Sequence, residues 1–165
     1  MSTPEAEKLV NLIETRLAEL QDLCEGLDDK TASRAPEGRW SPKEILSHIL
    51  GPEGKQITCT LKPFLKQDMP VIDIEPENTY YIGERARLPL GWLLTEVELE
   101  YVRMALFVSK LSKEQLNRKA HIPLMKGSAA GENPTLAAWV EAIADHHLGF
   151  HVNHMKEVLE ALAKS

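Results

Sequence analysis

The chain has 165 residues, of which 43% are hydrophobic and 27% charged, a composition that excludes a disordered or fibrous protein. It carries 19 Lys and Arg residues against 25 Asp and Glu residues, a formal net charge of −6, without any long basic run. We expect no nucleic-acid partner, because a phosphate-binding surface needs concentrated basic charge. The length suits one domain that covers residues 1–165.

The first ten residues lack the basic and apolar regions of a secretion signal, and no apolar run reaches the roughly 18 residues of a membrane span. Cys24 and Cys59 are isolated and form no CxxC pair, which suits a reducing compartment. We therefore expect a cytoplasmic protein without a membrane partner. Any metal ion would be held by ligands other than cysteine.

In the first half of the chain, apolar residues recur every three or four positions, as in helices. The first predicted helix runs from Pro4 to Leu27. The second begins at residues 41–44, Ser-Pro-Lys-Glu, which form a capping-box pattern. Pro52 cannot donate a backbone hydrogen bond, so we expect a kink at Gly51-Pro52 and a resumed helix from Ile57 to Leu65.

Residues 66–89 lack a helical period and predict a long irregular crossover, which would allow the second and third helices to run in the same direction. The third predicted helix covers Leu90 to Lys110, and the last covers Thr135 to Ala163. A short turn at 112–116 and a loop at 121–134 separate them. The pattern predicts an all-α four-helix bundle.

Four of the six histidines lie within residues 146–154 of the last predicted helix. At about 100° per residue, His147 and His151 lie one turn apart on one face, an arrangement by which two imidazoles can bind one metal ion. His154 shares that face, whereas His146 points about 100° away from His147. Spacing alone leaves several pairs among His147, His151 and His154 open.

A third ligand could come from His48, which lies within the apolar run 45–50, where an unpartnered ring is costly to bury. Four-helix bundles build metal sites from side chains on facing helices, and His48 with His147 and His151 has this form. Two alternatives remain. His48 could be a satisfied core histidine, and the spacing of His147 and His151 could be chance among solvent-facing residues.

Two segments resemble the DinB/YfiT-like proteins. Residues 40–49, WSPKEILSHI, resemble the family pattern WSxxExLxHL, and residues 134–155 are similar to its last helix, TLxEWL…H…HxxQI. The resemblance implies up-down-down-up helix connectivity and a divalent metal held by His48, His147 and His151. His154 stands where the family often has glutamine, which suggests a fourth imidazole. Gly51-Pro52 interrupts a helix that continues in many members.

A site with three histidines leaves metal positions open to water or substrate. Unlike HExxH, residues 147–151 offer no carboxylate between the ligands as a general base. Family members include thiol-dependent transferases and isomerases, so the resemblance implies a zinc or nickel ion, a low-molecular-weight thiol and a small-molecule substrate. The alternatives are a metal-dependent hydrolase and a non-catalytic metal-binding or interaction bundle. No catalytic residue is assigned.

An anionic thiol would require nearby cations, and the candidates are Arg85, Arg87, Arg103 and Lys126. The alternative is that these four residues are ordinary solvated surface charges. Glu44 lies one turn before His48, where it could orient the ring or cap the helix. Cys59 could approach the site if the kink is mild. Trp92 and Trp139 are interpreted as core or dimer-contact residues, and a homodimer through a helix face is a further option.

Overall fold

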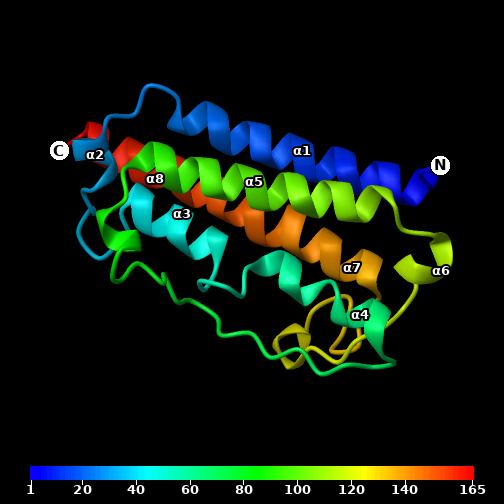
Figure 1. The fold of residues 1–165 in the computed structure, drawn as a ribbon. Helices are drawn as coiled ribbons and strands as arrows, with labels where there is room; N and C mark the ends of the chain where they lie inside the picture. Colours follow the sequence, from blue (N-terminus) through cyan, green and yellow to red (C-terminus); the bar gives the residue numbers. More distant parts are fainter.

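A computed structural model describes all residues, 1–165. Four helical segments pack side by side in it (Figure 1): α1 (Pro4–Cys24), α3 (Pro42–Leu50), α5 (Leu90–Ser109) and a last helix made of α7 (Leu136–Glu141), η4 (Ala142–Leu148) and α8 (Gly149–Ala163). In Figure 1, α1 and the last helix run from right to left, and α3 and α5 run from left to right. The predicted all-α four-helix bundle is confirmed.

One cluster of 35 buried apolar residues, drawn from all four segments, forms the core. The predicted stripe of α1 faces it, with Ile13 and Leu20 fully buried. However, α1 ends at Cys24, three residues before the predicted end at Leu27. The chain turns at Gly26, whose φ of 73° is a left-handed conformation that glycine adopts without steric cost.

The start of α3 has the predicted capping box. The Ser41 hydroxyl accepts a hydrogen bond from the Glu44 backbone N–H, and the Glu44 carboxylate accepts one from the Ser41 N–H. The prediction of a kinked helix that resumes from Ile57 to Leu65 was wrong. Gly51, at φ 82°, ends α3, and only η1 (Ile57–Thr60) and the single turn α4 (Pro63–Lys66) follow.

A short helix that the sequence did not predict, α2 (Asp29–Ala32), joins the starts of α3 and α5. The Lys43 ammonium donates to the Asp29 carboxylate at 2.8 Å, and the Leu90 N–H donates to the same carboxylate at 2.7 Å. Asp29 therefore caps α5, whose own N-cap residue, Pro89, makes no side-chain cap.

The predicted crossover, residues 66–89, contains only the last residue of α4 and η2 (Arg85–Arg87) as helical structure. Several hydrogen bonds attach it to the rest of the chain, and two lie near its ends. Arg85, only 3% exposed, donates to the Gly51 carbonyl at 2.5 Å, and the Ile72 N–H donates to the His121 carbonyl at 2.9 Å. The second contact attaches the crossover to the loop before α7, which follows α6 (Lys113–Leu116) and contains η3 (Pro123–Met125).

None of the helices combines the length and the apolar character needed to cross a lipid bilayer.

Candidate metal centre

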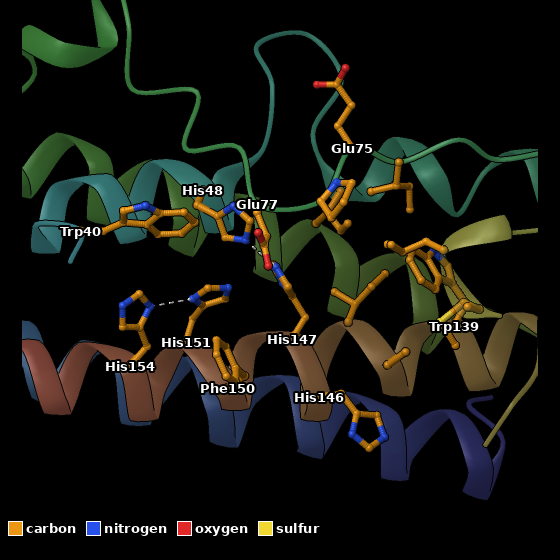
Figure 2. Close-up of a pocket in the computed structure, with 17 residues that line it drawn as sticks. Trp40, His48, Glu75, Glu77, Trp139, His146, His147, Phe150, His151 and His154 are labelled. Carbon is orange, nitrogen blue, oxygen red and sulfur yellow. Dashed lines mark hydrogen bonds between the residues drawn. The ribbon is translucent and has the colours of Figure 1, made fainter. Parts of the chain in front are cut away.

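The structure brings the three predicted histidines together. His48 comes from α3, His147 from η4 and His151 from the start of α8 (Figure 2). One ring nitrogen of each lies within 4.8 Å of the others. The sequence left open whether the second and last helices are neighbours, and they are.

A backbone contact orients His48. Its Nδ1 lies 2.7 Å from the carbonyl oxygen of Asn78, in the crossover, so the Nδ1–H donates there and the lone pair of the ring is on Nε2. That Nε2 lies 2.9 Å from Nε2 of His147. Metal-binding histidines characteristically donate their second ring N–H to an oxygen acceptor in this way.

His147 lies in η4, a π-helical stretch of seven residues inside the last helix. Such insertions are rare and occur often at functional sites. An ion pair to α1 holds the stretch in place, with Arg16 Nη2 2.6 Å from the Asp145 carboxylate. Burial, assisted by neighbouring His48, lowers the pKa of His147 to about 4, and its Nδ1 is buried without a hydrogen-bond partner.

His151 is buried, and the Trp40 ring stacks parallel to its ring with centroids 6.2 Å apart. Its Nδ1 lies 3.4 Å from Nδ1 of His154. Burial, followed by the neighbouring histidines, lowers the pKa of His151, and burial likewise lowers the pKa of His48. His154 contacts the side of His151 that faces away from the cluster in Figure 2 and is not among the three converging rings.

These residues fit a divalent transition metal. At neutral pH the lowered pKa values keep the rings uncharged, which is the form that binds zinc, nickel and similar ions. The Nε2 atoms of His48 and His147, which lie 2.9 Å apart, are close enough for one cation to bind both of their lone pairs. The predicted ligand set is thus geometrically suited to its predicted role.

The structure adds a residue that the sequence reasoning missed, Glu77. Figure 2 shows its carboxylate, carried by the crossover, turned toward His48 and His147. Its φ of 58° is a left-handed conformation that is unfavourable for a residue with a side chain. No sequence signal links Glu77 to the histidines, because it lies in a stretch without periodicity, 29 residues after His48.

The other candidates do not join the three histidines. The Glu44 carboxylate caps α3, and His146, which also lines the cavity beside the cluster, is exposed and points away from the other histidines in Figure 2. A cavity of about 740 Å³ adjoins the cluster, and Cys59 is not among its lining residues. Neither are the four basic residues considered as partners of an anionic thiol, Arg85, Arg87, Arg103 and Lys126.

The fold and the cluster define a class, a four-helix bundle with three converging histidines beside a cavity. No family model and no curated protein matches this sequence. The structure is similar to that of YfiT from Bacillus subtilis, with a TM-score of 0.74 and 18% sequence identity over 99% of this chain and 90% of YfiT. YfiT is described as a probable metal-dependent hydrolase with an unusual four-helix bundle topology. The resemblance to YfiT-like proteins is therefore confirmed for the fold.

Proposed function

We propose that this chain is a metal-dependent hydrolase that holds one divalent ion, zinc or nickel, with His48, His147 and His151. The observation that supports it most is the convergence of three ring nitrogens within 4.8 Å, one from α3 and two from the last helix. The description of YfiT as a probable metal-dependent hydrolase supports the same reaction class. Hydrolysis also agrees with the carboxylate of Glu77 beside the cluster.

A divalent ion at this position would polarise a substrate carbonyl and lower the pKa of water toward neutrality. Glu77 is placed to accept a proton from the attacking water and to return it to the leaving group. The water oxygen joins the carbonyl carbon, the C–O or C–N bond breaks, and the leaving alcohol or amine takes the proton. Asn78 holds the His48 ring in its orientation throughout.

Transfer of an anionic thiol, the other reaction considered, has less support. None of the four basic residues suggested as its partners lines the cavity. Arg85 in particular is buried, and its guanidinium is engaged by the carbonyl of Gly51. The site therefore offers an anionic cofactor no cationic side chain.

The metal site is tested by titrating zinc or nickel into chelator-stripped protein that carries no histidine tag. We expect one ion per chain, and we expect His147→Ala to weaken binding at least a hundredfold. His146→Ala is the matched control, because His146 is the adjacent residue of the same helix and points away. A protein without stoichiometric metal, together with a His147→Ala variant that melts like the wild type, would contradict the proposal.

The reaction class is tested with Glu77→Gln. This variant should keep the metal affinity of the wild type but lower kcat for a neutral ester by about a hundredfold, since proton transfer by a positioned side chain contributes at least that much. Consumption of a small thiol in the presence of an electrophile, with no ester or amide hydrolysed by the metal-loaded protein, would instead favour the thiol-dependent reaction.

A further inference from the structure

The cavity extends well beyond the histidines. Its lining on the last helix begins at Trp139 and ends at His154, which at 1.5 Å per residue corresponds to roughly 20 Å. Its volume of about 740 Å³ lies within the usual range for small-molecule sites. A metal ion and one water would occupy only one end, so the remaining length is available to a ligand.

The two ends differ in polarity. His48, His147, His151, His154 and Glu77 lie at one end in Figure 2, beside the aromatic rings of Trp40 and Phe150, and Trp139 lies at the other end. The lining also contains an apolar group, which consists of Ile57, Ile74, Leu124, Met125, Ala142 and Ile143. The Trp139 N–H donates to the Thr60 hydroxyl at 2.9 Å, so it is already satisfied. A ligand would therefore meet polar groups at the histidine end and hydrocarbon toward Trp139.

The charge of the lining excludes one kind of ligand. No lysine or arginine lines the cavity, and its two carboxylates belong to Glu75 and Glu77. In Figure 2, Glu75 is turned away from the histidines, whereas Glu77 is turned toward them. An anion away from the metal would meet like charge and no compensating cation, at a cost that grows as water is displaced.

We propose that the substrate is an uncharged ester or amide with a medium-length hydrocarbon chain, whose carbonyl lies beside the three histidines and whose chain lies along the last helix toward Trp139. The reaction assigned to this substrate rests on the proposed function. The chain-binding part rests on the shape and polarity of the cavity alone. The two can therefore be tested separately.

Binding is measured by tryptophan fluorescence, because two of the three tryptophans, Trp40 and Trp139, line the cavity. The probes are butan-1-ol, hexan-1-ol, octan-1-ol and octanoate, added to the full chain before and after removal of metal. In the metal-free chain we expect affinity for the alcohols to rise about fourfold per methylene group, as for buried hydrocarbon. Octanoate should bind it at least tenfold more weakly than octan-1-ol.

A variant tests where the hydrocarbon lies. Ala142 is half-buried on the cavity wall between Trp139 and His147, so Ala142→Leu should weaken octan-1-ol binding about tenfold and change butan-1-ol binding little. Asn153→Leu is the control, because Asn153 is exposed on the same helix outside the cavity. Both variants should melt close to the wild type.

Three results would overturn the inference: equal affinity for octanoate and octan-1-ol in the metal-free chain, affinity independent of chain length, or unchanged octan-1-ol binding in Ala142→Leu. Failure of the proposed function looks different. In that case the alcohols bind in order of length, but neither metal binding nor ester hydrolysis is found. Conversely, metal-dependent hydrolysis without any dependence on chain length would leave the function standing and remove this substrate.

Discussion

His154 contacts the three-histidine cluster from outside. Its Nδ1 lies 3.4 Å from Nδ1 of His151, the ring nitrogen that is turned away from the other two histidines in Figure 2. Partners of this kind fix the orientation of a ligand ring, and their loss commonly weakens metal binding 10- to 100-fold. We therefore predict that His154→Ala weakens zinc binding about tenfold in a calorimetric titration of the stripped protein.

Two further substitutions of His154 distinguish a role in orienting the His151 ring from a role in packing. His154→Gln places an amide oxygen within reach of the His151 ring and should recover most of the affinity, whereas His154→Leu, which preserves bulk only, should not. Equal affinity in the alanine, leucine and wild-type proteins would show that His154 has no such role. A loss as large as that of His147→Ala would instead make it a fourth ligand.

Local signals in the sequence made the three central histidines candidates, but spacing left pairs with His154 open, and the resemblance to the DinB/YfiT-like proteins selected this set. His147 and His151 share a helical face, and His48 interrupts an apolar run. Asn78 and Glu77 could not be predicted. Asn78 contributes a backbone carbonyl, which has no sequence signature, and the crossover brings both residues to the cluster through contacts far apart in the chain.

Among the elements, α3 depends on its N-cap, since it has only nine residues and carries His48. Ser41 is 2% exposed and caps the Glu44 N–H, so Ser41→Ala should lower the free energy of unfolding by about 1 kcal/mol in urea denaturation. Ser112 caps the four-residue helix α6 in the same way but is exposed. Ser112→Ala should therefore cost clearly less, and equal losses would contradict this account of α3.

The capping box of α3 was predictable because its residues lie within four positions of one another. The π-helical stretch η4 was not, because the residues around His147 have an ordinary helical apolar pattern. The contacts that accompany η4 are made with a distant part of the chain. Asp145 pairs with Arg16 of α1, and the Arg16 side chain passes so close to Gly149 that a Cβ there would lie 3.3 Å from its Nε. Contacts between the first and last helices leave no local pattern in either segment.

For the whole molecule, burial of uncharged histidines makes stability depend on pH. The pKa of His147 falls from 6.5 to about 4 on folding, so below pH 6.5 the unfolded chain binds a proton that the folded chain does not. The metal-free protein should therefore lose stability as the pH falls from 6.5 to 4, by about 3 kcal/mol from His147 alone. The lowered pKa of His151 acts in the same direction.

This dependence is measured by urea unfolding of the metal-free protein at several pH values from 7.5 to 4.5. His147→Leu should give a shallower slope, because one of the protons taken up on unfolding is removed. The carboxyls of Asp28 and Asp29 have pKa values lowered from 3.8, so their contributions are lost mainly below this window. Parallel slopes for the variant and the wild type would contradict the assignment to His147.

If the chain forms a homodimer, the outer face of α5 is the surface that we expect to mediate it. Four large apolar side chains are exposed there, namely Trp92 (59%), Leu99 (44%), Val102 (47%) and Leu106 (57%), although the opposite face of α5 lies in the core. Trp92, Leu99 and Leu106 repeat every seven residues, the spacing of helix-to-helix seams. Apolar residues on both faces of one helix indicate that the outer face is also covered.

We predict that a second copy of the chain covers this face. Two α5 helices related by a two-fold axis near Leu99 would run antiparallel, so that Glu96 of each copy would lie beside Arg103 of the other. We expect a dimer in sedimentation equilibrium at micromolar concentration, and Leu99→Glu should weaken dimerisation at least a hundredfold. Ile82→Glu is the control, because Ile82 is also a large apolar residue, is more exposed than Leu99 (77% against 44%) and lies in the crossover.

Charge reversal tests the orientation of the two copies. Arg103→Glu would place like charges opposite each other and should weaken the dimer about tenfold, whereas the double variant Glu96→Arg with Arg103→Glu restores opposite charges and should recover the wild-type affinity. Recovery would support an antiparallel pairing through α5, because only that arrangement brings residues 96 and 103 of different copies together. A wild-type chain that remains monomeric even at a concentration of about 100 μM would show instead that this apolar face has no role in self-association.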